Sequence, residues 1–291
     1  MPMNRRDFFQ KAAIGTAGTA LISALARPEW LRGATTPRKA NDVILLGPEK
    51  IRVARMAVGL GTLSGNVQRE MGLQGGADHL KFAFDQGQFF WDTADAYKTH
   101  PHIKQALKSV PREKVTIMTK TDVHTAADMK SDLDRFRQEL GTDYIDIVLL
   151  HGMRSPKWTD EFKPVMDVLS EAKAKGVIKC HGASIHSLEA MALAAKDPWC
   201  QVHLQGINHA GIRMDSTNPA DVVAIFRQSK ANGKGVLGMK ILGEGRLRDR
   251  IDQTLHFVLN LDCLDAFTIG AGNPKELADL IKRIPNASVA A

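Results

Sequence analysis

Residues 129–151 read Met-Lys-Ser-Asp-Leu-Asp-Arg-Phe-Arg-Gln-Glu-Leu-Gly-Thr-Asp-Tyr-Ile-Asp-Ile-Val-Leu-Leu-His and contain a helical pattern followed by a strand pattern. In the first half, apolar side chains recur three or four positions apart, at Met129, Leu133, Phe136 and Leu140. This spacing places them on one face of a helix and predicts that the face is buried. In the second half, the run Ile145–Leu150 is short and mostly apolar, which is typical of a strand covered on both sides.

The same alternation of amphipathic stretches and short apolar runs continues along the chain from about residue 54. A second apolar helix face is formed by Phe162, Val165, Met166 and Leu169. The strands are expected at Ala54–Val58, Phe89–Thr93, Val115–Thr119, Ile145–Leu150, Ile178–Ala183, Val202–Ile207, Gly235–Met239 and Ala266–Ile269. Eight strands separated by helices predict an α/β fold, a closed (β/α)₈ TIM barrel formed by a single domain. Leu45–Lys50 is expected to form a small hairpin over the barrel floor.

Ionisable side chains follow three neighbouring strands of this predicted barrel. Asp92 and Tyr97 follow the second strand, Lys120 follows the third and His151 follows the fourth. In (β/α)₈ barrels, the reactive groups lie at the C-terminal ends of the strands and in the loops after them. We therefore expect these four side chains to converge at one mouth of the barrel.

These four groups are suited to the reduction of a carbonyl, which requires a proton on oxygen as well as a hydride on carbon. A phenol with a reference pKa of about 10 is a weak acid at neutral pH unless its anion is stabilised. Lys120 would lower the pKa of Tyr97, and Asp92 would keep Lys120 charged and in place. His151 would hydrogen-bond the substrate oxygen and orient it. Each residue alone has an ordinary structural explanation, but their joint position favours catalysis.

The segments around these residues resemble the aldo/keto reductases. Phe90-Trp91-Asp92-Thr93-Ala94-x-x-Tyr97 is similar to the family's Asp-Thr-Ala-x-x-Tyr signature, and Tyr144–His151 is similar to its Tyr-Ile-Asp-x-x-x-x-His strand. The similarity extends over about residues 51–284 and includes Gly176–Lys179, Gly182–Ser184 and Gln205. It implies an NAD(P)H-dependent oxidoreductase that interconverts a small-molecule carbonyl and an alcohol. Its catalytic residues would be Asp92, Tyr97, Lys120 and His151, with Tyr97 as proton donor.

The resemblance also implies a nicotinamide cofactor held by Gly61, Thr62, Ser184, Gln205, Gly270, Asn273 and Lys275. Two positions depart from the family pattern, because Ile185 replaces an Asn at the nicotinamide and Asn208 replaces a stacking aromatic residue. The Lys, Ser and Arg that the family often places around the 2′-phosphate of NADPH are not matched in Gly270–Lys275. Backbone N–H groups at the start of the next helix can still hold a phosphate. We expect NADP or NAD as cofactor, with a slight preference for NADP.

The N-terminal segment has the layout of an export signal. Arg5-Arg6 with Phe8 precedes an uncharged stretch, Ala12–Ala26, that ends in Ala24-Leu25-Ala26. This resembles the twin-arginine signal, and the stretch is too short for a bilayer span of about 20 residues. We expect a signal peptide at 1–26, a linker at 27–42 and the barrel at 43–291, with periplasmic or extracytoplasmic localisation after contact with the twin-arginine export machinery. An N-terminal helix packed on the barrel is the alternative, and stable membrane insertion is not expected.

The net charge of +7 would suggest an acidic macromolecular partner, but the distribution of the charged residues argues against one. Residues 1–50 hold eight Lys and Arg against four Asp and Glu, which leaves 31 against 28 for the remainder. The barrel is therefore only mildly basic, and it contains no basic run with interleaved aromatic residues. Nucleic-acid binding is not expected.

Three other functions remain open at this point. Histidines near predicted strand ends would suit a metal-dependent hydrolase, namely His151, His181, His186, His203 and His209. That site would need converging ligands, and the His-x-His pair that commonly opens such sites on the first strand is absent from Val58–Thr62. The cysteines Cys180, Cys200 and Cys263 are far apart, sit in apolar segments and form no Cys-x-x-Cys pair, so they offer no zinc site. A dinucleotide-binding sheet is suggested by Gly59-x-Gly61-x-x-x-Gly65, which misses the usual spacing by one residue. The third is an exported barrel whose degenerate nicotinamide site serves binding or scaffolding.

Overall fold

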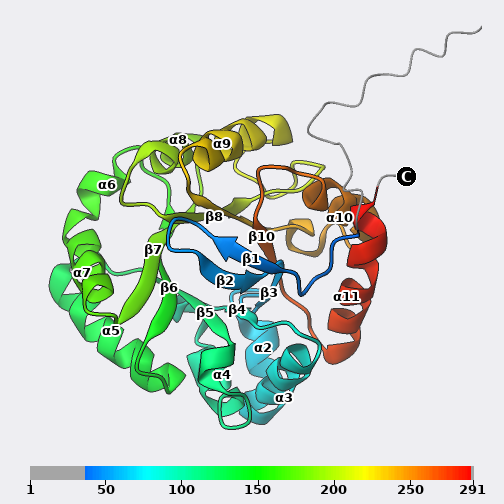
Figure 1. Cartoon of the computed structure of the whole chain (residues 1–291), viewed down its shortest axis with the longest axis horizontal. Helices are drawn as coiled ribbons and strands as arrows, with labels where there is room; N and C mark the ends of the chain where they lie inside the picture. Colours follow the sequence, from blue (N-terminus) through cyan, green and yellow to red (C-terminus); the bar gives the residue numbers. More distant parts are fainter. Residues whose placement is uncertain (1–36, 290–291) are drawn as a thin grey trace, which may run out of the picture.

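Eight parallel strands form a closed barrel in the computed structural model of the chain, which describes residues 37–289 (Figure 1). The strands are β3 (Met56–Gly59), β4 (Phe90–Asp92), β5 (Thr116–Thr121), β6 (Ile145–Met153), β7 (Ile178–Ile185), β8 (Val202–Gly206), β9 (Gly235–Met239) and β10 (Ala266–Ile269). The barrel closes where Phe267, Thr268 and Ile269 of β10 pair with Met56, Ala57 and Val58 of β3. The predicted (β/α)₈ barrel is confirmed.

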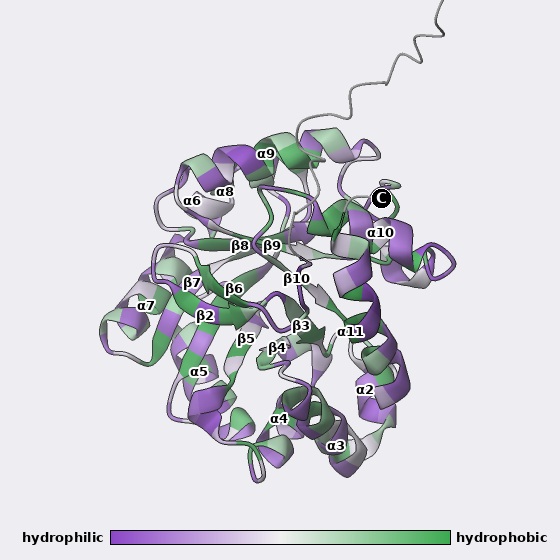
Figure 2. Ribbon diagram, turned by 45° about the vertical axis from the view of Figure 1, so that its right-hand side comes forward, coloured by the Kyte–Doolittle hydropathy of each residue, from purple (hydrophilic) through white to green (hydrophobic). Residues whose placement is uncertain are grey.

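Helices surround the barrel and turn their apolar faces toward it, so that in Figure 2 their outer surfaces are largely purple and the strands largely green. Both apolar stripes predicted from the sequence are buried, one on α5 and one along α7 with the residue before it. The helices are α2 (Asn66–Glu70), α3 (Gly72–Asp85), α4 (His100–Ala106), α5 (Ala126–Leu140), α6 (Trp158–Glu161), α7 (Lys163–Ala174), α8 (Leu188–Lys196), α9 (Pro219–Ala231), α10 (Ile251–Leu259) and α11 (Pro274–Ser288).

An antiparallel hairpin lies across one end of the barrel, and it is longer than expected. Its strands are β1 (Val43–Leu46) and β2 (Ile51–Ala54), so the predicted segment Leu45–Lys50 is mainly its turn. The prediction of the first barrel strand, Ala54–Val58, was wrong at its N-terminal end, because Ala54 belongs to the hairpin and the barrel strand begins at Met56. Arg55 separates the two elements, because its N–H bonds to Asp42 of the hairpin while its carbonyl accepts from Phe267 of the barrel. Apolar residues on both sides of Arg55 made the two elements look like one strand.

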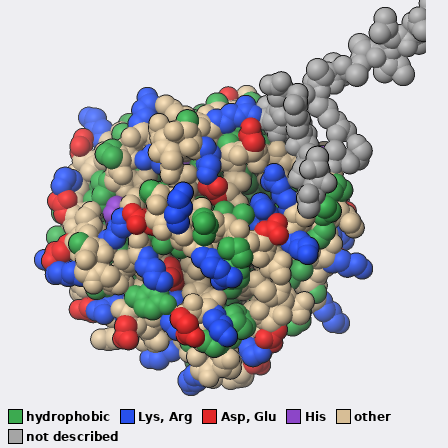
Figure 3. All heavy atoms as spheres, viewed as in Figure 1, with side chains coloured by type: hydrophobic (Ala, Val, Ile, Leu, Met, Phe, Trp, Pro, Cys, Tyr) green, Lys and Arg blue, Asp and Glu red, His purple; other side chains and the backbone are tan. Residues whose placement is uncertain are grey.

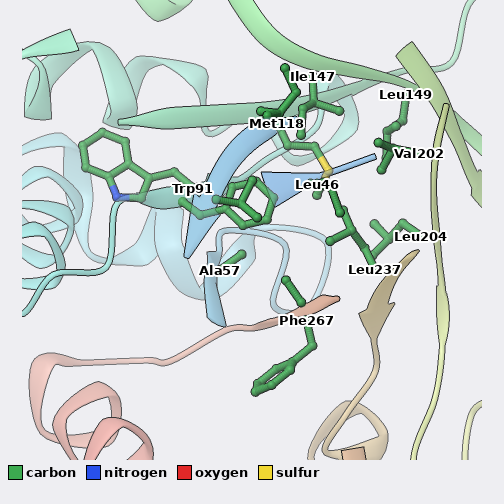
Figure 4. Close-up of a cluster of buried hydrophobic side chains, with 14 of the residues drawn as sticks. Leu46, Ala57, Trp91, Met118, Ile147, Leu149, Val202, Leu204, Leu237 and Phe267 are labelled. Atoms are coloured by element: carbon green, nitrogen blue, oxygen red, sulfur yellow. The ribbon is translucent and has the colours of Figure 1, made fainter. Parts of the chain in front are cut away.

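The barrel interior is filled by large apolar side chains and is therefore a packed core. Figure 4 shows Leu46 of the hairpin among side chains from several strands, including Met118 and Leu237. A Cβ on Gly235 would lie 2.8 Å from Leu46, so the absence of a side chain there makes room for the hairpin. The floor of the barrel is thus closed, and the opposite end carries the polar strand ends.

The three cysteines are free and buried, as the sequence predicted. Burial raises the pKa of each thiol to about 12, which keeps all three protonated. They act as small apolar side chains.

The exterior of the barrel mixes charges of both signs. On the floor face drawn in Figure 3, Lys and Arg alternate with Asp and Glu, and neither sign forms a continuous patch there. Among residues 37–289, none of the helices is long and apolar enough to cross a bilayer. The predicted signal peptide, residues 1–26, and residues 27–36 of the predicted linker lie outside the described residues.

Candidate active site

The four predicted catalytic residues lie on three adjacent strands at the C-terminal end of the barrel. Asp92 is the last residue of β4, Lys120 is the penultimate residue of β5 and His151 lies near the end of β6. Tyr97 ends a short 3₁₀ turn, Asp95–Tyr97, that follows β4. Because β4, β5 and β6 are parallel neighbours, these ends meet at one mouth.

Lys120 and Asp92 form a buried ion pair. Lys120 Nζ donates to Asp92 Oδ1 over 2.5 Å and to the carbonyl oxygen of Thr93 over 2.7 Å. The Lys120 side chain is only 1% exposed. Burial lowers the pKa of this ammonium, but Asp92 and Tyr97 raise it more, so its pKa lies above the usual value. Lys120 therefore stays charged inside the barrel, as expected.

The ring of Tyr97 lies close to both Lys120 and His151. Lys120 Nζ is 4.9 Å from the ring centroid, and the His151 ring meets Tyr97 edge-on at 5.7 Å between centroids. Gly61 also lies against the phenol, since a Cβ there would be 2.5 Å from Tyr97. Gly61, predicted as a cofactor residue, therefore also makes room for the Tyr97 ring.

The pKa of Tyr97 is shifted in the direction opposite to the one expected. Lys120 lowers the pKa of the phenol, but burial and the carboxylates of Asp92 and Asp122 together raise it more. The net pKa lies above the usual value for tyrosine. The phenol consequently keeps its proton at neutral pH, while Lys120 remains the group that would stabilise a phenolate.

His151 is oriented by Asp122, a residue that the sequence reasoning missed. Nδ1 of His151 lies 3.0 Å from Asp122 Oδ1 and 3.2 Å from Oδ2. A proton on Nδ1 satisfies this contact, and the ring would need a proton on Nε2 as well to donate to a carbonyl oxygen of the substrate. The spacing of two residues between Lys120 and Asp122, which places them on the same side of an extended chain, was the available signal.

Ser184 and Gln205 fit the amide of a nicotinamide. They lie at the ends of the adjacent strands β7 and β8, and both are buried. Ser184 Oγ and Gln205 Oε1 lack hydrogen-bond partners within the described part of the chain, whereas Gln205 Nε2 contacts His203 Nδ1. Buried polar atoms without partners are costly, and a carboxamide could both donate to and accept from them.

The two departures from the family pattern have different consequences. Ile185 is fully buried and offers no amide to a nicotinamide. Asn208 instead organises the loop after β8, because its Nδ2 donates to the carbonyls of Ile212 and Lys240 and its Oδ1 accepts from two backbone N–H groups. Its hydrogen bonds explain why an amide stands where an aromatic ring was expected.

The remaining residues predicted to bind the cofactor lie where β3 and β10 end. Thr62 and Gly270 touch, since a Cβ on Gly270 would lie 2.0 Å from Thr62 Oγ1. Asn273 caps α11 by accepting from the N–H of Glu276. Glu276, also missed from the sequence, accepts in turn from Gly272 N over 2.7 Å and Asn273 Nδ2 over 3.0 Å. A carboxylate thus already occupies this helix start, next to the exposed Lys275.

The histidines proposed for a hydrolase do not converge. His181 stacks on Trp199, while His209 contacts Thr254 on α10. Within residues 37–289, the one group of side chains spaced like metal ligands is Asp95, His100 and Glu139, which includes none of the five. Arg135 pairs with Asp95 and Glu139 there, and its charge opposes a cation.

Comparison with known proteins agrees with this geometry. A model of the aldo/keto reductase family matches residues 55–281. The chain therefore belongs to the aldo/keto reductase family. Curated relatives of this aldo/keto reductase include the aldo-keto reductase 1 of Glycine max, 28% identical over 48% of the chain and 44% of the relative. Another is the NADH-specific methylglyoxal reductase of Escherichia coli K12, 26% identical over 48% of the chain and 51% of the relative.

The chain thus spans about half the length of the curated relatives it matches. Solved structures are similar over more of the fold. An aldo-keto reductase from Pseudomonas aeruginosa has a TM-score of 0.71 at 23% identity and covers 86% of this chain and 96% of its own. An aldo/keto reductase from Klebsiella pneumoniae in complex with NADP and acetate has a TM-score of 0.66 at 18% identity, with 85% and 90% covered. At these identities the structures support the fold alone.

Proposed function

We propose that this aldo/keto reductase interconverts a small carbonyl compound and an alcohol with a nicotinamide nucleotide, with Tyr97 as proton donor. The observation that carries the proposal is the buried Lys120–Asp92 ion pair beside the Tyr97 ring and next to His151. Four groups of this kind at one mouth serve proton transfer to oxygen better than they serve structure, because a buried ion pair is costly to maintain.

Each residue has a defined part in the reaction. A bound reduced nicotinamide would supply the hydride to the carbonyl carbon. His151 orients the carbonyl oxygen by a hydrogen bond, and the Tyr97 hydroxyl gives that oxygen its proton, which completes the alcohol. Lys120 stabilises the phenolate that remains on Tyr97, and Asp92 holds Lys120 in place. Solvent then restores the proton on Tyr97, which is half-buried at the mouth.

In this proposal, Ser184 and Gln205 would hold the carboxamide of the nicotinamide, and Gly61, Thr62 and Gly270 would line the rest of the nucleotide site. The sequence suggested a slight preference for NADP. The carboxylate of Glu276 argues for NAD, because a 2′-phosphate near Asn273 and Lys275 would meet a like charge. One relative, from Escherichia coli, is named as NADH-specific. We therefore favour NADH over NADPH.

Tyr97→Phe tests the central claim, since it removes the hydroxyl and keeps the ring that packs on Gly61. Turnover of an activated aromatic aldehyde or a quinone should fall by several orders of magnitude, because the general acid is lost. Nucleotide binding, followed by fluorescence, should change little. Retained turnover in the variant would overturn the mechanism. Nucleotide binding by a wild-type protein that reduces no carbonyl would instead favour the binding or scaffold function.

Export through the twin-arginine pathway to the periplasm is a separate proposal, supported by Arg5-Arg6 and Ala24-Leu25-Ala26. Replacing both arginines with Lys should keep the protein in the cytoplasm, as fractionation would show. Cleavage after Ala26 should leave Arg27 as the first residue of the exported form. Normal export of the doubly substituted precursor would refute this proposal.

A further inference from the structure

His203 is a buried histidine of the barrel wall that contacts the proposed nicotinamide site. It lies two residues before Gln205 in β8. Because alternate residues of a strand point to the same side, the two side chains lie on one face of the sheet. Leu204, between them, points into the packed barrel interior (Figure 4), so His203 and Gln205 lie on the outer face. There the His203 ring packs near Phe226 of α9, with 6.0 Å between the ring centroids.

The adjoining strands offer the amide of Gln205 no polar side chain. Ser184 of β7 pairs with Leu204 of β8. The next residues along the two strands, Ile185 and Gln205, are therefore neighbours. On the other side, Gln205 pairs with Gly238 of β9, which has no side chain. Neither neighbour can orient the amide.

A hydrogen bond to His203 orients the amide instead. It joins Gln205 Nε2 to His203 Nδ1, and it is the one hydrogen bond of the Gln205 side chain among residues 37–289. An amide nitrogen donates and does not accept, so Nδ1 accepts and the imidazole proton resides on Nε2. Burial lowers the pKa of His203 to about 4, and the charges of Lys234 and Lys230 lower it as well. The imidazole is therefore neutral at neutral pH, and Nδ1 keeps its lone pair.

This contact uses the donor end of the Gln205 amide and leaves the acceptor end free. Oε1 is buried and has no hydrogen-bond partner in the described part of the chain. A buried acceptor of this kind is complementary to an N–H group. Turning the amide over would bring Oε1 against Nδ1 of His203, and two acceptors would face each other until the imidazole moved its proton from Nε2 to Nδ1. His203 therefore favours the orientation in which Oε1 is free.

Packing alone does not explain a histidine at this position. His203 Nε2 is buried and lacks a hydrogen-bond partner within residues 37–289. A buried donor without a partner destabilises a fold, and an apolar ring would pack on Phe226 without this cost. The hydrogen bond to Gln205 gives the imidazole a use that an apolar ring could not supply.

We propose that His203 is a positioning residue for the nicotinamide, which holds the amide of Gln205 with its oxygen toward the cofactor. Gln205 Oε1 then accepts from the N–H groups of the carboxamide, while Ser184 Oγ donates to the carboxamide oxygen. This inference rests on the proposed function and narrows the cofactor to pyridine nucleotides whose 3-substituent carries an N–H donor. His203 acts through Gln205, and proton transfer stays with Tyr97.

The test compares NADH with its reduced 3-acetylpyridine analogue, in which a methyl group replaces the amide nitrogen. Wild type should bind NADH more tightly, because the methyl group cannot donate to Gln205 Oε1. His203→Phe keeps a ring beside Phe226 and lets the Gln205 amide turn its nitrogen toward the acetyl oxygen. The preference for NADH, measured as the ratio of dissociation constants by fluorescence, should fall by about 5- to 10-fold. The thionicotinamide analogue keeps the N–H groups, so its affinity relative to NADH should not change.

Two further variants separate positioning from a general loss of structure. His181→Phe is the matched control, because it removes another buried histidine, which stacks on Trp199 beside the neighbouring strand β7. It should keep the wild-type preference for NADH. Gln205→Leu leaves His203 in place and should lose the preference to at least the same extent. Thermal unfolding of each variant establishes that the barrel is folded during the binding measurements.

The outcomes distinguish this inference from the proposed function. A preference for NADH that is lost in Gln205→Leu and unchanged in His203→Phe would overturn the positioning role and leave the reductase function intact. Equal weakening of both nucleotides in His203→Phe would also overturn it, because the histidine would then support the fold alone. Failure of the wild type to bind any of these nucleotides would refute the proposed function, and this inference with it.

Discussion

At the scale of single residues, the raised pKa of Tyr97 shapes the pH profiles that we expect for reduction and for oxidation. The phenol keeps its proton at neutral pH, so it is ready to act as an acid in carbonyl reduction. Alcohol oxidation needs the deprotonated form, which burial and two carboxylates disfavour. We therefore expect reduction to vary little with pH between about 6 and 9 through Tyr97, and oxidation to rise with pH toward the pKa of this residue.

Lys120→Met tests the one interaction that lowers the pKa of Tyr97. Its loss should raise that pKa further, reduce turnover by at least about 10²-fold and shift the oxidation pH profile to higher pH. Because the variant leaves Asp92 buried without its partner, its unfolding should be measured alongside, with Lys120→Met/Asp92→Asn as the control that removes the unpaired charge. An oxidation pH profile identical to that of the wild type would exclude Lys120 from the proton step.

Glu276→Gln tests the nucleotide preference. It keeps the hydrogen bond from Gly272 and removes the negative charge at the start of α11. NADPH should then bind about 2- to 5-fold more tightly relative to NADH, since one exposed like-charge contact near a phosphate is lost. Asp279→Asn, farther along the same helix, is the control and should leave the ratio of the two dissociation constants as it is. A wild-type preference for NADPH would refute the assignment.

At the scale of elements, helix α5 holds the turn that carries Tyr97. Arg135 donates to both carboxylate oxygens of Asp95, over 2.8 Å and 2.9 Å, and Asp95 begins the 3₁₀ turn that ends at Tyr97. Thr93 and Thr99 join the two ends of the same loop through a buried contact between their hydroxyls. The position of the phenol therefore depends on a helix that contributes nothing to the reaction itself.

Arg135→Lys should weaken the contact between α5 and Asp95, because an ammonium cannot make two parallel hydrogen bonds to a carboxylate. We expect kcat to fall by about 10-fold with KM nearly unchanged, since a small displacement of the acid affects the chemical step more than binding. Arg137→Lys on the same helix is the control, because Arg137 pairs with the nearby Asp134 and has no contact with the loop. A change in KM alone would argue against a positioning role.

That the four proposed catalytic residues lie together could be predicted from the sequence, because strand ends in a parallel barrel share one face whatever the details of packing. Asp122 and Glu276 could not, since their roles depend on side-chain contacts with His151 and the start of α11. The break at Arg55 was missed because apolar residues precede and follow this single charged residue. Asn208 was interpreted as a lost contact, whereas its hydrogen bonds to the loop after β8 give it a structural role that spacing does not reveal.

At the scale of the whole molecule, buried histidines make stability depend on pH. Burial lowers the pKa of His181 and His203 to about 4, and the unfolded chain titrates near the reference value of about 6.5. Between these values the unfolded state binds more protons, so the free energy of unfolding falls as pH falls through this window. The loss is about 2 kcal/mol for each histidine between pH 7 and pH 5.

His181→Phe tests this dependence, because phenylalanine can keep the stacking on Trp199 without titrating. The variant should lose less stability than the wild type between pH 7 and pH 5, by about 2 kcal/mol. Denaturant unfolding at pH 5, 6 and 7 provides the measurement. Equal slopes of stability against pH in both proteins would show that His181 does not contribute.

The pairing of β10 with β3 also affects the order in which the protein folds during synthesis. The catalytic residues are all synthesised by the end of β6, yet the wall around them is complete only when Ala266–Ile269 reaches the first barrel strand. Pairings between distant segments form late in folding. The entropy cost of closing a long loop must be met before the contacts between the segments can stabilise the chain. A nascent chain that stops after β6 would carry the whole catalytic set with two unpaired strand edges, and Thr62 would lack Gly270 beside it. The proposed reactive side chains are therefore synthesised early, but the site that contains them is completed only in the last step of folding.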